Sequence, residues 1–193
     1  RYKRSVLGYL WSMLNPLFMM IILAVVFSNI MQQRVEDYAV FLFAGMLPWA
    51  YFNTTIRASI DTIRANARIM DQVSVPKYVF ALSNAFSSLV DFVLSLIPLI
   101  LITLVIGREV PATILLTPMM IITLFMFSMG VALICAASNV FFEDTTHLVT
   151  VLLQAIYFLC PILYSREMLP AWLIKWVTIN PMFGIIESTR GLF

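Results

Sequence analysis

Charged side chains recur at steps of three and four residues between positions 57 and 71, which places them on one face of a helix. They are Arg57, Asp61, Arg64, Arg68 and Asp71. An apolar face adjoins them and consists of Ile56, Ile60, Ile63, Ala67 and Met70. Two interpretations stay open. One is a solvated helix stabilised by ion pairs worth roughly 0.2–0.5 kcal/mol each, and the other is an amphipathic helix that docks on a partner protein.

A second group of polar residues has a spacing that also places it on one helix face. It consists of Asn84, Ser87, Ser88, Asp91 and Ser95. An ionisable side chain at the centre of a membrane span costs about 2.5–3.5 kcal/mol on insertion scales, so we expect Asp91 to face protein or water. The stripe is therefore either a packing face of small serines or the border of a water-filled space.

Aromatic residues gather in three places. Trp172 and Trp176 lie in the last group, and we interpret them as anchors at the membrane–water boundary. Rings that face an aqueous cavity would instead offer flat apolar surfaces to the faces of sugars. Together with Ser88 and Asp91, the candidates for lining such a channel are Trp49, Tyr51, Phe52, Tyr157, Phe158 and Tyr164.

Motifs for catalysis and cofactor binding are missing from the chain. None of its six glycines is followed by lysine, so it has no phosphate-binding loop of the G-x-x-x-x-G-K-[ST] type. One histidine and two separated cysteines do not have the spacing of a zinc site. His147 lies near Asp144, but an acid–base pair needs a third positioned group, and we interpret the two as a solvated pair at a helix start. We predict no catalytic residue, metal or cofactor in this chain.

The composition indicates which solvent surrounds these residues. The chain is 62% hydrophobic and 11% charged, whereas a soluble domain has about 25% charged residues. Its apolar residues form long runs, and a run of roughly 18 or more predicts a transmembrane helix. The net charge of +2 is too small to indicate nucleic-acid binding. We therefore predict an all-α, polytopic membrane helix bundle.

The runs divide the chain into one surface helix and five spans. Residues 1–15 predict an amphipathic helix that lies on the membrane. The predicted spans are 16–31, 38–55, 78–106, 112–138 and 148–163. The helix of the second span is expected to continue as a rod until Val75 and Pro76. The third is long enough to be tilted or to begin with an interfacial piece.

The segment after the fifth span contains Pro161, Pro170 and Pro181, and its apolar pieces are too short to cross a membrane. We predict short re-entrant or interfacial helices there. Lys and Arg favour a cytoplasmic N-terminus by seven residues against five. The seven are Arg1, Lys3, Arg4, Arg57, Arg64, Arg68 and Lys77, and the five are Arg34, Arg108, Arg166, Lys175 and Arg190.

Several longer segments are similar to motifs of one family. They are RYKRSVLGYLWSMLNPL, AGMLPWAYF, NARIMDQVSVPKYVFAL, and NVFFEDTTHLVTVLLQAIYFLCPILY followed by INPMFGIIESTR. The first is similar to R-Y-x-x-S-x-L-G-x-L-W-x-x-L-x-P, the second to G-L-x-P-W-x-F-F and the third to N-x-x-L-(I/V)-x-x-V-x-F-P-(R/K). In this order they resemble permease subunits of ABC exporters for bacterial surface polysaccharides, of the O-antigen, capsule and teichoic-acid type.

The resemblance implies a single transmembrane domain over residues 1–193 in the bacterial inner membrane. It would pair with a second copy of itself and with two ATP-binding subunits, which would carry the ATP and magnesium. Its substrate would be a lipid-linked glycan passing between the two permeases, with gating helices between Pro161 and Pro181. The ATPase-coupling helix would contain Arg64, Asn66, Arg68, Ile69, Met70, Asp71, Val75, Pro76 and Lys77.

The chain departs from the family pattern in three respects. Asp71 and Gln72 stand where a basic pair is usual, and Glu143 stands before Asp144 where arginine is usual. The family's sixth span and C-terminal tail are absent from this sequence. We therefore expect the native protein to continue past Phe193 with another apolar stretch.

Two alternatives to glycan export stay open. One is an ABC permease of the same superfamily that exports drugs or lipids. The other is a membrane enzyme such as a lipid-processing transferase, which needs catalytic groups that converge near one membrane face. Asp91 is the single acid that we place within a span, and this disfavours the enzyme.

Overall fold

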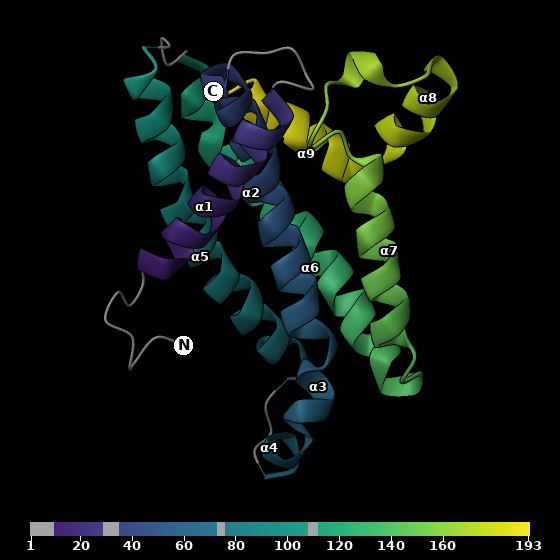
Figure 1. Ribbon diagram of the computed structural model, residues 1–193. Helices are drawn as coiled ribbons and strands as arrows, with labels where there is room; N and C mark the ends of the chain where they lie inside the picture. Colours follow the sequence, from purple (N-terminus) through teal and green to yellow (C-terminus); the bar gives the residue numbers. More distant parts are fainter. Residues whose placement is uncertain (1–9, 29–34, 73–75, 108–111) are drawn as a thin grey trace.

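The computed structural model describes residues 10–28, 35–72, 76–107 and 112–193, and these residues form a helical bundle (Figure 1). Short 3-10 turns precede α6 and α8, at Ala112–Leu116 and Arg166–Met168. The helices are α1 (Leu10–Ser28), α2 (Val35–Ile60), α3 (Thr62–Ala65), α4 (Ala67–Gln72), α5 (Tyr78–Val105), α6 (Thr117–Phe141), α7 (Thr145–Leu159), α8 (Ala171–Ile179) and α9 (Pro181–Arg190). The predicted all-α membrane bundle is confirmed.

Three helical stretches of the described residues are long and apolar enough to cross a membrane: Asp37–Ile60, Tyr78–Val105 and Thr113–Phe141. They correspond to the second, third and fourth predicted spans. The first and fifth are present as the shorter apolar helices Pro16–Phe27 and Thr145–Leu159. At 28 residues α5 is about 42 Å long, which exceeds a hydrocarbon core of about 30 Å and indicates tilt or an end outside the core.

The predicted boundary between a surface helix and the first span is wrong. α1 runs without a break from Leu10 through Pro16 to Ser28. Proline lacks a backbone donor, but in a membrane helix the freed carbonyl can be satisfied locally, so the helix continues. The first nine residues of the predicted surface helix lie outside the described residues.

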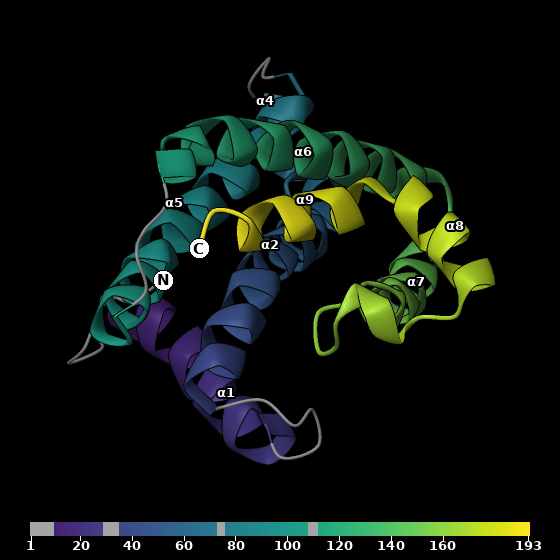
Figure 2. The same ribbon diagram turned by 90° about the horizontal axis from the view of Figure 1, so that it is seen from above.

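α2 is the central helix of the bundle. It packs against α1, α5, α6 and α9, and it shares a shorter contact with α7. Most of its residues are buried, and Leu42, Phe43 and Ile56, for example, are completely buried. Ala50, Thr54 and Arg57 are exposed, so one face stays open. Seen from above, α5, α6, α9 and α7 surround α2 (Figure 2), and α2 therefore positions the helices that contact it.

Small side chains make part of the contact between α5, α6 and their neighbours. On α6 the buried positions recur every four residues at Ser128, Ala132 and Ala136, and on α5 Ala81 and Ala85 are completely buried. Both helices pack on α2 and on each other. Small residues allow helix backbones to approach closely, which is how membrane helices associate where lipid gives no hydrophobic driving force. We call these five residues the small-residue seam.

The predicted rod from α2 to residue 75 is also wrong. α2 ends at Ile60, and two short helices, α3 and α4, follow it. Side chains bind the carbonyls near the breaks: the Asn139 amide donates to the Ile60 carbonyl at 3.1 Å, and the Asn66 amide donates to the Thr62 carbonyl at 2.7 Å. Asn side chains compete with helix hydrogen bonds in this way, so the amphipathic pattern is divided between short pieces.

The proline-rich segment after α7 forms short helices, as predicted. α8 begins after Pro170, and α9 has Pro181 at its first position, where a missing N–H costs nothing. The Asn180 side chain accepts a hydrogen bond from the backbone N–H of Met182 at 3.0 Å and caps α9. α8 and α9 lie at the opposite end of the bundle from α3 and α4 (Figure 1). Trp172 and Trp176 are exposed on α8, as membrane anchors would be.

Candidate functional site

The predicted coupling segment projects beyond the rest of the bundle as α3 and α4 (Figure 1). Arg64, Arg68, Ile69, Pro76 and Lys77 are exposed there, and Asn66 is half-buried. Ile69 exposes half of its surface, beside the exposed basic residues Arg68 and Arg64. The backbones of Met70 and Asp71 lie in α4, their side chains are not described, and Val75 lies outside the described residues. The exposed apolar and basic residues have the composition of a docking surface.

A polar network attaches this segment to the turn between α6 and α7. Arg64 forms an ion pair with Glu143. Asn139 is completely buried, and its amide donates to the Asp61 carboxylate at 2.9 Å. The Thr146 hydroxyl lies 3.2 Å from the Asn139 side-chain oxygen and 3.3 Å from the Asp61 carboxylate. The network therefore joins α3 and the turn before it to the end of α6 and the start of α7.

Replacing Asn139 with leucine is expected to lower the free energy of unfolding by about 1–3 kcal/mol, because the Ile60 carbonyl and the Asp61 carboxylate lose a buried donor. Thermal unfolding of the purified protein in detergent measures the change. Thr146→Val is the matched control, with an expected loss below about 1 kcal/mol because its contacts are longer and partly exposed. An Asn139→Leu protein as stable as the wild type would contradict the network.

At the other end of α2, Arg190 of α9 joins three segments. Its side chain is 9% exposed, and its guanidinium donates to the carbonyls of Phe41 at 3.3 Å and Ile162 at 2.9 Å and to Glu187 at 3.0 Å. The same group lies 3.5 Å from the centre of the Phe41 ring, a cation–π contact. Burial lowers the pKa of Arg190, and Glu187 acts in the opposite direction. We call these contacts the Arg190 clamp.

Neighbouring residues of α2 leave room for the Arg190 side chain and add a second contact to the same loop. A side-chain carbon at Gly45 would lie 2.9 Å from the Arg190 guanidinium, so glycine makes room for the arginine. About two turns before Gly45 on α2, the Tyr38 hydroxyl donates to the Leu163 carbonyl at 2.7 Å. The loop after α7 is therefore held to α2 through Ile162 and Leu163.

Between α2 and α7 lies a groove of about 260 Å³, which we call the α2–α7 groove. Its α2 wall is formed by Trp49, Asn53 and Arg57, which are four residues apart and share one helix face. Its α7 wall is formed by Leu153, Gln154, Tyr157 and Phe158. The rings of Trp49 and Tyr157 lie 5.6 Å apart across the groove. Aromatic and polar side chains thus converge in an otherwise apolar part of the bundle.

The structure separates the predicted channel residues into three sets. Tyr51, Phe52 and Ser88 are buried between helices of this subunit, and the Phe52 ring stacks on that of Phe127. Trp49, Tyr157 and Phe158 line the α2–α7 groove, where Trp49 is buried and Phe158 is exposed. Asp91 and Tyr164 are half-buried and line no part of this groove, and the Tyr164 hydroxyl donates to the Phe158 carbonyl at 2.8 Å.

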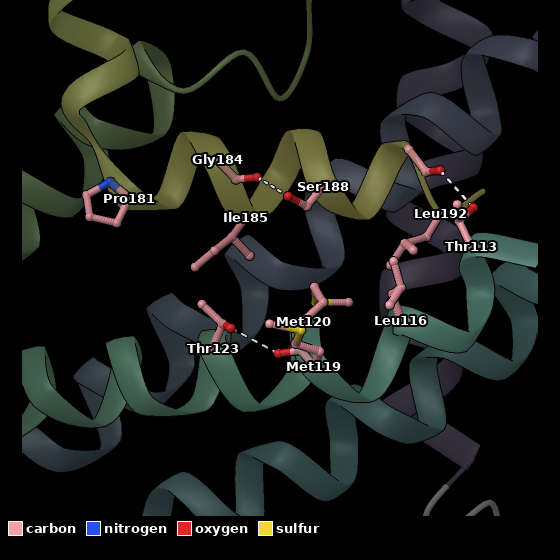
Figure 3. A pocket seen from close by; sticks show the side chains of 11 residues that line it. Thr113, Leu116, Met119, Met120, Thr123, Pro181, Gly184, Ile185, Ser188 and Leu192 are labelled. Atoms are coloured by element: carbon pink, nitrogen blue, oxygen red, sulfur yellow. Dashed lines mark hydrogen bonds between the residues drawn. The ribbon is translucent and has the colours of Figure 1, made fainter.

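A larger cavity of about 580 Å³ lies between α6 and α9 (Figure 3). Met119, Met120 and Ile185 form part of its wall. The hydroxyls at its edge bond to backbone carbonyls, such as Thr123 to Met119 at 2.9 Å and Ser188 to Gly184 at 2.7 Å. With its hydroxyls occupied in this way, the cavity suits hydrocarbon better than sugar.

The sequence interpretation did not identify Arg190, Asn139 or the polar residues Asn53 and Gln154 as functional. Arg190 looks like an ordinary basic residue near a helix end, and the segments that it contacts are distant in sequence. A signal did exist for Asn53 and Arg57, since they lie four and eight residues after Trp49 on one face of α2. Their pairing with α7 required the fold.

Comparison with known proteins supports a transport role. The profile of the ABC-2 type transporter family matches residues 1–193, the entire chain. RfbA of Klebsiella pneumoniae, an O-antigen export system permease protein, is 34% identical over 100% of this chain and 75% of its own length. RfbA of Myxococcus xanthus is 29% identical over the same shares. KpsM of Escherichia coli, a polysialic acid transport protein, is 26% identical over 98% of this chain and 75% of its own length.

Three findings agree with one another: a family profile that matches every residue, a relative at 34% identity and, within the described residues, three helices that are long and apolar enough to cross a membrane. The chain therefore belongs to the ABC-2 type transporter family, as a multi-pass transport subunit.

Proposed function

We propose that this chain is the membrane-spanning subunit of an ATP-driven exporter of lipid-linked polysaccharide in the bacterial inner membrane. The observation that carries the proposal is the similarity, over the whole chain, to permeases named for O-antigen export. The polysaccharide would be an O-antigen, a capsule polymer or a teichoic acid. ATP hydrolysis would take place on two separate ATP-binding subunits, which supply ATP and magnesium, and a second copy of this chain would complete the path.

The coupling segment α3–α4 would face the cytoplasm together with the N-terminus. Arg57, Arg64, Arg68 and Lys77 gather at this end of the bundle, as cytoplasmic basic residues do. The ATP-binding subunit would contact Ile69 and the basic residues beside it. The network of Asp61, Arg64 and Asn139 would pass its movement to α2 and α7.

The short helices α8 and α9 would form the outer gate, held to α2 by the Arg190 clamp. The glycan would move from α3 towards α9 along the open side of the bundle, past Trp49, Tyr157 and Phe158. Asp91 lies on α5, which packs on α2 at Tyr51 and does not line this groove, so Asp91 would border only a second path on that side of α2. The burial of Ser88 favours a packing role in this conformation.

A defined assay tests the proposal. The permease and its ATP-binding subunit, reconstituted together in nanodiscs, are expected to hydrolyse ATP several times faster when a lipid-linked O-antigen or capsule glycan is added. The same lipid carrier without sugars is the control and should have no such effect. Stimulation by an amphiphilic drug or a free lipid, with no response to any lipid-linked glycan, would instead support the drug or lipid exporter.

A further inference from the structure

The α2–α7 groove contains a positive charge without a negative partner. Arg57 is exposed at the groove, and its Nε donates to the Asn53 side-chain oxygen at 2.8 Å. The structure shows no ion pair for Arg57 and no hydrogen bond for its two terminal amino groups among the described residues. The bond to Asn53 fixes the plane of the guanidinium while its outer edge stays free.

An arginine whose terminal amino groups are free is suited to bind an anionic ligand. The planar guanidinium offers two parallel N–H donors that match the oxygens of a phosphate, and such charge-assisted pairs are stronger than neutral hydrogen bonds. Gln154 faces the groove from α7 and is exposed, so its amide is available to the same ligand. A ligand that matches both side chains therefore carries an oxyanion, either a phosphate or a carboxylate, and further hydrogen-bonding groups.

The position of Arg57 along the bundle indicates which anionic molecule can reach it. It lies in the last turn of α2, directly before the coupling segment. Under the proposed orientation this is the level of the headgroups of the cytoplasmic leaflet. Trp49 and Tyr157, which face each other across the groove, lie about 12 Å farther towards α9, since eight residues of helix separate Trp49 from Arg57. A phosphate at Arg57 would thus place an attached sugar directly before the rings.

We infer that Arg57, oriented by Asn53 and assisted by Gln154, binds the phosphate that links the lipid to the glycan at the entrance of the transport path. This inference rests on the proposed function and adds a binding site to it. The bound phosphate is the first contact of the substrate with the permease. From it the first sugar advances to the rings of Trp49 and Tyr157.

The test measures lipid binding to the complete permease–ATPase complex in phosphatidylcholine nanodiscs, by native mass spectrometry. One probe is a polyprenyl diphosphate carrying N-acetylglucosamine, and the other is phosphatidylglycerol, which carries a phosphate from a bulk lipid. Arg57→Gln is expected to weaken binding of the first probe about tenfold or more, the usual effect of losing a charge-assisted pair. Arg57→Lys, which keeps the charge but not the fork, should weaken it less. Thr54→Ala is the matched control, because Thr54 is exposed beside Asn53 and does not line the groove.

Each outcome decides the question. Selective loss of the diphosphate-linked sugar in Arg57→Gln, with phosphatidylglycerol unaffected, supports the inference. If Arg57→Gln weakens the binding of both probes equally, Arg57 is an anchor for lipid headgroups in general and the inference is overturned. Unchanged binding of the first probe would overturn the inference as well. A wild-type complex that binds no lipid-linked sugar at all would overturn both the inference and the proposed function, so the two failures are distinguishable.

Discussion

Replacing Arg190 with alanine is expected to destabilise the protein by about 3 kcal/mol, because hydrogen bonds to a charged group contribute roughly 1.5–3 kcal/mol each and several are lost together without being additive. The Ile162 carbonyl would be left without its donor, and Glu187 would lose its ion pair. The effect should concentrate at α9 and at the loop after α7. Thermal unfolding in detergent and limited proteolysis between residues 160 and 181 measure the two consequences.

Two further variants make this prediction specific to the clamp. Arg166→Ala removes an exposed guanidinium that lies 5.8 Å from the centre of the Phe183 ring, so its expected cost is below about 1 kcal/mol. Arg190→Lys keeps the charge, but one ammonium group cannot reach three partners that lie in different directions, so it should resemble the alanine variant. A loss in Arg190→Ala no larger than that in Arg166→Ala would show that the clamp does not stabilise the fold.

Replacing Ile69 with aspartate is expected to abolish the association of this chain with its ATP-binding subunit. An exposed apolar residue at the centre of a docking surface contributes 2 kcal/mol or more, which is roughly thirtyfold in affinity, and a buried carboxylate adds a desolvation cost. Co-purification from membranes measures the association, and ATP-dependent export should fall with it. The permease itself should stay in the membrane, because α4 lies outside the bundle.

Ile179 provides the control for this variant. It is exposed on α8, at the opposite end of the bundle, so Ile179→Asp should leave the ATP-binding subunit attached. If the Ile69→Asp protein still co-purifies with its ATP-binding subunit in normal amounts, α4 is not the docking element. The adjacent ion pair of Arg64 with Glu143 would then be a purely structural contact.

Helix boundaries are predicted most accurately from the sequence where a single long apolar run ends at residues that stop a helix. The prediction for residues 78–106 agrees with α5 to within one residue at each end, because Pro76 precedes the helix and Gly107 follows it. Gly107 adopts a φ of 77°, a left-handed conformation that most side chains avoid, and so it ends the helix. In such a run the local chemistry determines the boundary.

Elsewhere distant parts of the chain decide the structure. The break after Ile60 depends on Asn139, which is 79 residues away, and no local pattern indicates it. The Arg190 clamp joins residues 149 positions apart. In the α2–α7 groove the spacing of Trp49 and Arg57 was visible in the sequence, but only the packing of α2 beside α7 shows what faces them. Residue type and periodicity predict the faces of helices, whereas the fold determines their partners.

The small-residue seam has a mechanical consequence. Large interlocking side chains would tie α6 to one register along α2, because any shift would force their ridges over one another. Alanines and serines form a shallow surface, so a shear of an ångström or two changes few contacts. The buried hydroxyls of Ser88 and Ser128 have no hydrogen-bond partner among the described residues, so no polar bond of theirs opposes the shift. The network fixes the end of α6 and the start of α7 to the end of α2, and the clamp fixes the loop after α7 near the other end of α2. A shift at the seam is therefore limited to the part of α6 beyond the network, which can move in small steps without unpacking the core.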